Sequence, residues 1–176
     1  FRNGGQACTC VNRIFVAKEV HDEFVQKLVT EGKKLKIGDG FTESDIGPMI
    51  NENAKIKVKT LVEDAIKNGA KVEIGNLEDK GLFFTPTILT NVKSDMEIAN
   101  QEIFGAVGAI QKFDSIDEVI KLSNNTKYGL GSYLYSENQS TIFKISNALE
   151  FGMVAINGDS FATELAPFGG IKHSGF

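Results

Sequence analysis

Residues 107–122 read VGAIQKFDSIDEVIKL and join an apolar run to a helical segment. The run at 107–113 is typical of a strand. Ser115 is a good N-cap for the helix that follows to Leu122, and Asp117 and Glu118 lie at its positive end. The alternation continues with a strand, a helix and a strand at residues 131–135, 140–149 and 153–156. Elements in this order form an α/β layer through right-handed crossovers. The sequence therefore predicts an α/β fold with a mainly parallel, twisted sheet flanked by helices.

The first half of the chain adds two helices and three strands to this prediction. Apolar residues at a period near 3.6 indicate a helix over residues 20–35. A second helix is expected over residues 51–68, ended by Gly69. Short strands are expected at residues 14–16, 70–74 and 82–89, and Pro86 marks an edge or a bend in the last of them.

Composition excludes several classes of protein. The 176 residues are 41% hydrophobic and 24% charged, with a formal net charge of −4. These values are ordinary for a globular protein of one domain. The negative net charge gives no sign of the excess of basic residues that is typical of nucleic-acid-binding proteins. No apolar run approaches the roughly 20 residues that span a bilayer. Two cysteines one residue apart do not form a secreted disulfide framework, so a reducing cytoplasm is expected. The chain does not begin with Met, and we expect it to be a piece of a longer protein.

Residues 4–10, GGQACTC, carry the strongest chemical signal. Two glycines allow a tight turn and a close approach to a ligand. Cys8 follows within one helical turn, and a thiolate is favoured by a helix N-terminus or by a cation such as Arg2. We interpret Cys8 as a nucleophile on a corner between a loop and a helix; the alternative is a small buried apolar residue. A metal site at Cys8 and Cys10 is disfavoured because neither histidine has the spacing of a zinc ligand.

The last segment, residues 166–176, reads APFGGIKHSGF. Its glycine and proline content predicts a loop. Loops that follow the carboxyl ends of parallel strands are where ligands bind in α/β folds. This loop is therefore a second candidate part of a binding site.

Four runs, in order along the chain, resemble motifs of the aldehyde dehydrogenase superfamily. Residues 1–8 (FRNGGQAC) resemble its active-cysteine signature, and residues 102–105 (EIFG) resemble its cofactor-contacting Glu-x-Phe-Gly segment. Residues 125–130 (NTKYGL) are similar to its Asn-x-x-Tyr-Gly-Leu turn, and residues 167–175 (PFGGIKHSG) to its Pro-Phe-Gly-Gly-x-Lys-x-Ser-Gly loop. The resemblance covers nearly the whole chain and implies the fold of the family's catalytic domain over residues 1–176. It also implies that the nucleotide-binding domain and the oligomerisation strand of the family lie outside this chain.

The resemblance assigns a role to three residues. Cys8 would attack an aldehyde to form a thiohemiacetal and then a thioester, which water releases as the acid. Glu102 would accept hydrogen bonds from the nicotinamide ribose of NAD or NADP, and Phe104 would lie against the nicotinamide ring. Solvated loop charge is the alternative for Glu102. In the family, the general base and one of the two groups that donate hydrogen bonds to the oxyanion belong to the other domain. The isolated chain is therefore expected to be inactive.

Succinate-semialdehyde dehydrogenases are the members that the chain resembles most, through the Cys-x-Cys pair, Arg2 and residues 164–167. This likeness implies that Arg2 binds a substrate carboxylate, against the alternative of a surface salt bridge. Phe168 would form a wall of the aldehyde tunnel, or anchor its own loop. Cys10 is a candidate partner of Cys8 in a reversible disulfide switch, or a plain packed thiol. Ala162 stands where relatives often place a serine that binds the carboxylate, and Ser160 or Thr163 are the possible substitutes.

The preferred hypothesis is thus the catalytic half of an NAD(P)-dependent aldehyde dehydrogenase, with succinate semialdehyde as the expected substrate. Two alternatives remain open: a relative that transfers the acyl group to coenzyme A, and a non-catalytic remnant of the fold with a structural or interaction role. The expected partner is a small aldehyde, with no nucleic acid and no membrane, and the full-length protein is expected to form a homo-oligomer.

Overall fold

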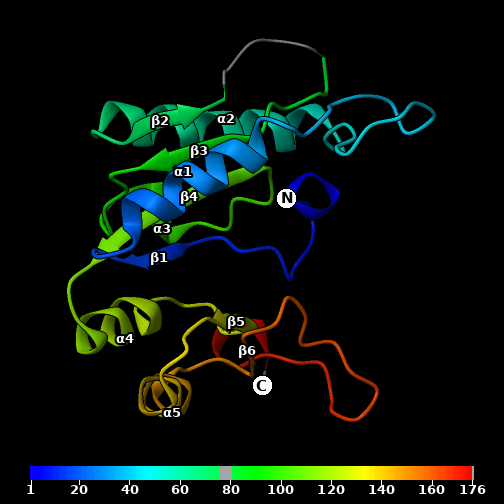
Figure 1. Ribbon diagram of the computed structural model, residues 1–176. Helices are drawn as coiled ribbons and strands as arrows, with labels where there is room; N and C mark the ends of the chain where they lie inside the picture. Colours follow the sequence, from blue (N-terminus) through cyan, green and yellow to red (C-terminus); the bar gives the residue numbers. More distant parts are fainter. Residues whose placement is uncertain (76–80, 176) are drawn as a thin grey trace. The chain divides into compact units, whose positions relative to one another are not determined.

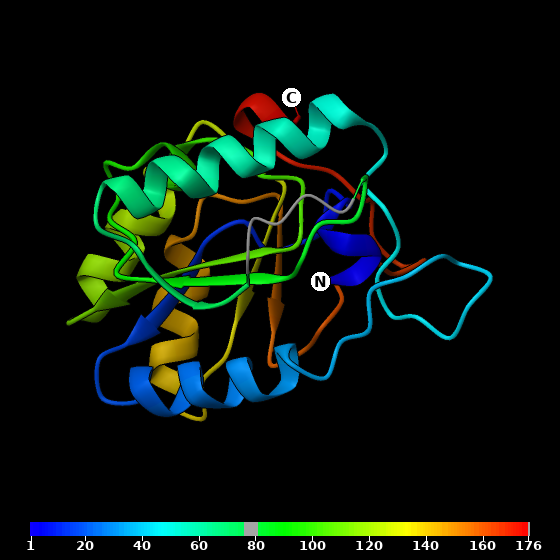
Figure 2. The same cartoon turned by 90° about the horizontal axis from the view of Figure 1, so that it is seen from above.

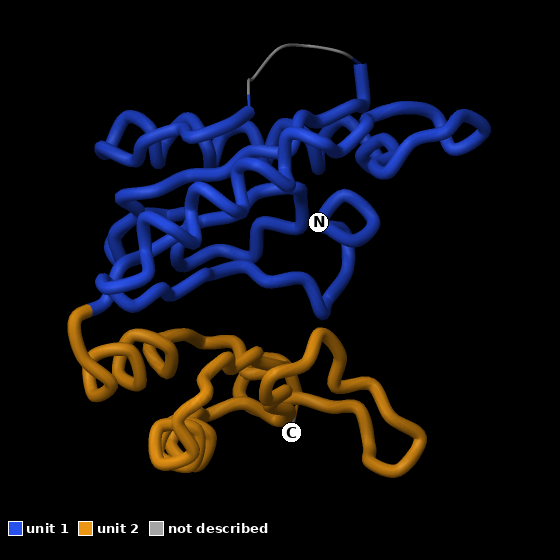
Figure 3. The backbone as a smooth tube through the Cα atoms, viewed as in Figure 1, with its two compact units in different colours: residues 1–113 blue, residues 114–176 orange. Residues whose placement is uncertain are grey.

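The computed structural model describes residues 1–75 and 81–175. The chain divides into two compact units, Phe1–Phe113 and Asp114–Phe176, which are coloured separately in Figure 3. Each unit has its own sheet, and the runs that carry the chemical signals are distributed over both.

The first unit contains a four-stranded sheet in the order β1-β4-β3-β2 (Figure 1). Its strands are β1 (Ile14–Ala17), β2 (Lys71–Ile74), β3 (Thr87–Thr90) and β4 (Val107–Phe113). β1 and β3 both run parallel to β4, and only β2 is antiparallel to its neighbour β3. The predicted mainly parallel sheet is therefore confirmed.

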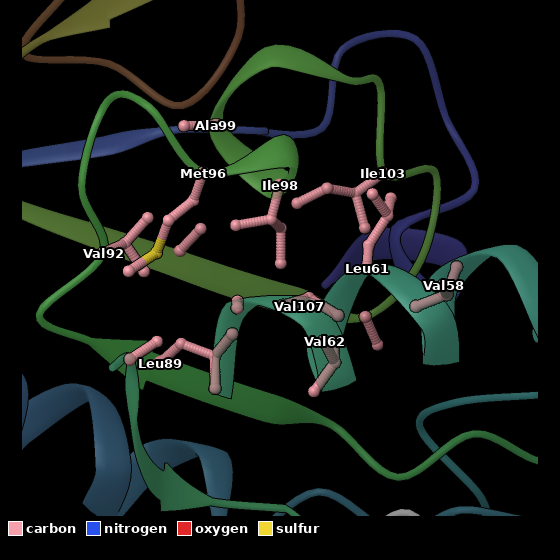
Figure 4. Packing of buried hydrophobic residues seen from close by; sticks show 14 of the residues in the cluster. Val58, Leu61, Val62, Leu89, Val92, Met96, Ile98, Ala99, Ile103 and Val107 are labelled. Carbon is pink, nitrogen blue, oxygen red and sulfur yellow. The ribbon is translucent and has the colours of Figure 1, made fainter. Parts of the chain in front are cut away.

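Helices cover both faces of this sheet, as Figure 2 shows for α1 (His21–Gly32) and α2 (Glu52–Lys67). Alternate residues of a strand point to opposite faces. In β4, Val107 and Ala109 accordingly pack in the core with α2 and α3 (Glu97–Asn100), whereas Ile110 packs with α1. Figure 4 shows the larger of these two cores, between α2, α3 and the sheet. A strand covered on both faces reads as an apolar run, which is the pattern at residues 107–113.

The stop of α2 at Gly69 was predicted, whereas Asn51, expected as its first residue, is its N-cap. The Asn51 side chain accepts a hydrogen bond from the Ala54 N–H at 2.9 Å and caps α2, and Gly69 beyond its last turn has φ +102°. An L side chain is strained at such a φ, so glycine is favoured there. α1 ends at Gly32, three residues earlier than expected.

Pro86 lies directly before β3, and this corrects the prediction of a strand over residues 82–89. The strand begins at Thr87 and lies inside the sheet, between β4 and β2. A proline has no N–H to donate to a strand ladder, so the paired segment starts after it.

The second unit is formed by α4 (Ile116–Asn124), β5 (Gly131–Leu134), α5 (Gln139–Ala148) and β6 (Met153–Ile156). β5 and β6 pair in parallel as a separate two-stranded sheet, and Ser115 caps α4 by accepting from the Glu118 N–H at 3.2 Å. The expectation that β4, β5 and β6 form one sheet is wrong. The neighbours of β4 in its sheet are β1 and β3, whereas β5 and β6 are hydrogen-bonded to each other.

The runs at residues 125–130 and 167–175 are held together within this unit. The Lys172 ammonium donates to the backbone oxygens of Asn124 and Thr126 at 2.9 and 3.3 Å. The Gly129 carbonyl accepts a hydrogen bond from the Ile171 N–H, and the Gly129 N–H donates to the Ser174 hydroxyl. The Lys127 carbonyl accepts from the His173 N–H. The segment at 172–174, predicted as loop, forms a short 3-10 helix (η2, Lys172–Ser174). These contacts fix the base of the loop that carries Phe168.

Within the residues that the structure describes, no helix has the length and apolar character needed to cross a membrane.

Candidate functional site

The backbone before Cys8 is bent in the left-handed region. Asn3, Gly4 and Gly5 have φ values of +50°, +64° and +79°. They belong to the 3-10 segment η1 (Arg2–Gly5). Asparagine and glycine are the residues that adopt this region most readily, so the sequence at positions 3–5 explains the bend.

Gly5 packs directly against the backbone of another loop. A Cβ atom built on Gly5 would lie 2.0 Å from the carbonyl oxygen of Gly105 and 2.8 Å from the nitrogen of Ala106. The sequence predicted that these glycines approach a ligand, and at Gly5 the close approach is to the chain's own segment. The contact brings the cysteine loop against the run at residues 102–105.

The Gln6 side chain attaches the cysteine loop to the segment before α2. Its amide nitrogen donates to the Pro48 carbonyl at 3.2 Å, and its amide oxygen accepts from the Ile50 N–H at 2.8 Å. One side chain thus satisfies two backbone groups of the same segment.

Cys8 lies in an exposed turn and is a free thiol. The turn is closed by a bond from the Cys10 N–H to the Ala7 carbonyl at 3.0 Å. The expected corner between a loop and a helix is corrected: the next regular element after Cys8 is the strand β1, so Cys8 does not lie at the start of a helix. Among the described residues, none accepts a hydrogen bond from the backbone N–H of Cys8. Its exposure also argues against the alternative of a buried apolar residue.

Cys10 differs from Cys8 in its surroundings. It is half-buried and its thiol donates to the Arg2 carbonyl at 3.4 Å. Both cysteines are free, and their pairing as a redox switch stays a prediction. In the described parts of the chain, no three side chains of the types that bind metals are grouped.

Glu102 and Phe104 lie in the loop between α3 and β4. Both are exposed, Phe104 to 37%, whereas Ile103 between them is only 2% exposed and anchors the loop in the larger core. Phe104 has φ +57°, which is unusual for an aromatic residue. The loop therefore presents two side chains outward around one buried residue.

Asn12 was not predicted as part of the site, but its amide connects the cysteine loop with this segment. Its nitrogen donates to the Gln101 carbonyl at 2.9 Å, and its oxygen accepts from the Ile103 N–H at 2.7 Å. An asparagine between the Cys-x-Cys pair and the strand at 14–16 was a visible signal, since asparagine side chains often bind backbone groups.

Arg2 is exposed beside the cysteine loop. Among the ion pairs of the described residues, none includes Arg2, so the alternative of a surface salt bridge finds no partner there. Its guanidinium group remains available for a planar anion.

Phe168 lies in the second unit and is 52% exposed. Its ring stands 6.3 Å from that of Phe161, which in turn lies 4.9 Å from the ring of Tyr133 on β5. Phe161 also contacts β5 at Gly131, where an added Cβ atom would lie 2.4 Å from the ring. The row of rings supports the loop, so the anchoring role considered for Phe168 is compatible with its exposure.

Comparisons with known proteins place the whole chain in one family. Residues 1–176 match the profile of the aldehyde dehydrogenase family. The chain is 46% identical over 176 residues to a glutarate-semialdehyde dehydrogenase of Pseudomonas putida, covering 99% of this chain and 37% of that protein. The structure matches that of a succinate-semialdehyde dehydrogenase from Burkholderia pseudomallei with a TM-score of 0.95 at 43% identity, over 99% of this chain and 37% of the other.

A betaine aldehyde dehydrogenase from Staphylococcus aureus, solved in complex with NAD+, matches with a TM-score of 0.90 at 33% identity, over 97% of this chain and 35% of the other. The family uses NAD+ or NADP+. The chain spans a little more than a third of the length of the relatives that it matches. By its sequence over all 176 residues and by its fold, this chain belongs to the aldehyde dehydrogenase family.

Proposed function

We propose that residues 1–176 form the cysteine-bearing catalytic part of an NAD(P)-dependent aldehyde dehydrogenase that oxidises a semialdehyde to a dicarboxylic acid. One observation carries the proposal. The exposed Cys8 lies on a loop that packs, backbone against backbone, on the segment that presents Glu102 and Phe104.

Cys8 acts as the nucleophile. Its sulfur adds to the aldehyde carbon, and the carbonyl oxygen takes the negative charge as the thiohemiacetal forms. The backbone N–H of Cys8 points to no acceptor among the described residues and donates to this oxygen. One such donor is typically worth about 2.7–4 kcal/mol of transition-state stabilisation. Loss of hydride from the same carbon leaves a thioester on Cys8, and water cleaves it to the acid and the free thiol.

Glu102 and Phe104 hold the nicotinamide cofactor. The exposed Glu102 carboxylate only accepts hydrogen bonds, so it fits the ribose hydroxyls of NAD+ or NADP+, and the outward face of Phe104 fits the planar ring. When bound, the oxidised nicotinamide accepts the hydride. The buried Ile103 keeps the two side chains on the outer face of the loop.

Arg2 recognises the distal carboxylate of the substrate. It is exposed on the same short segment as the glycine bend, and its planar group fits a carboxylate in a bidentate manner.

The substrate class is tested by Arg2→Ala in the complete protein, with any sequence that flanks residues 1–176. Hydrogen bonds to charged groups contribute about 1.5–3 kcal/mol, so kcat/KM for succinate or glutarate semialdehyde should fall by about 10- to 150-fold. Butanal and pentanal are the matched uncharged aldehydes, and their kcat/KM should stay unchanged. An equal fall for charged and uncharged aldehydes would refute the assignment of Arg2.

Residues 1–176 alone are proposed not to turn over aldehyde, since they span 37% of the length of the glutarate-semialdehyde dehydrogenase that they resemble. Incubation with aldehyde and NAD+ tests this through the absorbance of the reduced cofactor. A turnover near the enzyme median of about 10 per second would contradict it.

The complete protein is proposed to form a homo-oligomer, which sedimentation tests. Large apolar side chains such as Phe41, Phe143 and Leu165 are fully or largely exposed.

A further inference from the structure

The Asn12 side chain forms hydrogen bonds with the backbone on both sides of Glu102. The amide nitrogen of Asn12 binds the carbonyl of Gln101, directly before Glu102, at 2.9 Å. The amide oxygen binds the N–H of Ile103, directly after Glu102, at 2.7 Å. A single rigid amide therefore fixes two consecutive peptide units, and the Glu102 Cα atom lies between them.

The loop at residues 101–105 depends on these two hydrogen bonds because its backbone conformation is energetically unfavourable. Ile103 is 2% exposed, so water has little access to its N–H once the Asn12 oxygen is removed. Phe104 follows at φ +57°, a region that aromatic residues occupy only where the surroundings hold them. The backbone contact of Gly5 with Gly105 fixes the other end of the loop. Asn12 is the side chain that ties the beginning of the loop to the cysteine segment.

We propose that Asn12 is a positioning residue for the cofactor, which sets the direction of Glu102 and Phe104 relative to the cysteine loop. This inference rests on the proposed function, since it gives the orientation of the two side chains that bind the nicotinamide nucleoside. Asn12 itself touches neither substrate nor cofactor and acts through the backbone at residues 101–103.

The test is Asn12→Ala in the complete protein, with NAD+ and NADP+ as probes. The dissociation constant and the KM for the preferred cofactor should rise by about 10- to 150-fold, the loss expected when the hydrogen bonds to the Glu102 carboxylate are no longer made. The alkylation rate of Cys8 by iodoacetamide without cofactor should stay unchanged, because Gly5 and Gln6 still hold the cysteine loop. Amide hydrogen exchange at Ile103 should become faster.

Asn68→Ala is the matched control. Its amide nitrogen also makes two bonds, to the Asp64 carbonyl at 2.8 Å and to the Asp64 carboxylate at 3.1 Å, at the end of α2. Cofactor binding should be unchanged in this variant. Asn12→Asp serves if Asn12→Ala does not fold: it has the same shape and still accepts from Ile103, but it presents an oxygen to the Gln101 carbonyl. It should therefore also weaken cofactor binding.

The outcomes separate the two proposals. Wild-type protein that binds neither NAD+ nor NADP+ overturns the proposed function and this inference with it. Wild-type protein that binds the cofactor, while folded Asn12→Ala or Asn12→Asp binds it equally well, overturns this inference alone. An equal loss of binding in Asn68→Ala also overturns it, because the effect would then be general destabilisation.

Discussion

Gly5→Ala tests the close packing between the cysteine loop and the segment at residues 102–105. The new Cβ atom would lie 2.0 Å from the Gly105 carbonyl oxygen and 2.3 Å from its carbon, and the backbone at Gly5 has φ +79°. The left-handed conformation costs an L residue about 1–2 kcal/mol. The overlap is with backbone, which cannot rotate away, and overpacking of this kind costs typically about 1–3 kcal/mol more. We expect a loss of about 2–5 kcal/mol in the free energy of unfolding.

Two further glycines divide this loss into its parts. Gly69 has φ +102° with no atom within 4 Å of an added Cβ, so Gly69→Ala measures backbone strain alone. Gly40 also has open space around an added Cβ and no positive φ, so Gly40→Ala should change stability very little. The sequence contains no tryptophan, and urea unfolding is therefore followed by far-ultraviolet circular dichroism.

From the most to the least stable, the expected order of the variants is Gly40→Ala, Gly69→Ala and Gly5→Ala. The Gly5 variant should also displace the cysteine loop and change the alkylation rate of Cys8, which the other two should not. If Gly5→Ala costs no more than Gly69→Ala, the two loops do not pack backbone against backbone, and the geometric basis of the site is wrong.

Three further results are expected. Lys172→Met should lower the free energy of unfolding by about 1.5–3 kcal/mol in thermal unfolding, since the ammonium binds two backbone carbonyls and pairs with Glu150 at 2.7 Å. Iodoacetamide should alkylate Cys8 faster than Cys10, because Cys8 is exposed and Cys10 is half-buried with its thiol bonded to a carbonyl; peptide mapping measures both rates. Thr90→Val should reduce the loss of stability in acid. The Thr90 hydroxyl bonds the Glu73 carboxylate at 2.7 Å and lowers its pKa, so the stabilisation is complete above the usual pKa of 4.5 and is lost as pH falls through the lowered value.

Each of these has a control or a contrary outcome. Lys144→Met removes an exposed ion pair with Asp117 and should lower the free energy of unfolding by no more than about 1 kcal/mol. If Lys172→Met lowers it by the same amount, Lys172 has no special structural role. Equal alkylation rates for the two cysteines would remove the distinction between them. A Thr90→Val protein with the acid transition of the wild type would show that Glu73 gains no stabilisation from the hydroxyl.

Local sequence patterns determined most elements of the fold. The strand at residues 107–113 and the cap at Ser115 were predictable because each depends on neighbouring residues only: an apolar run, or a side chain that binds an N–H three residues on. The pairing of strands was not predictable in this way. The continuous alternation after residue 107 indicated one sheet, but the neighbours of β4 are β1, from the other end of the sequence, and β3, whereas β5 and β6 pair with each other.

The candidate site divides along the same line. The sequence by itself determined the reactive residue type, the glycine bend and the four motifs of the family, because these are properties of short runs. Only the tertiary structure placed Cys8 in a turn instead of at a helix, and only it showed Gly5 against Gly105 and Asn12 across Glu102. These contacts join residues about 90–100 positions apart, and no local preference encodes which backbone groups meet after the core has closed around Ile103.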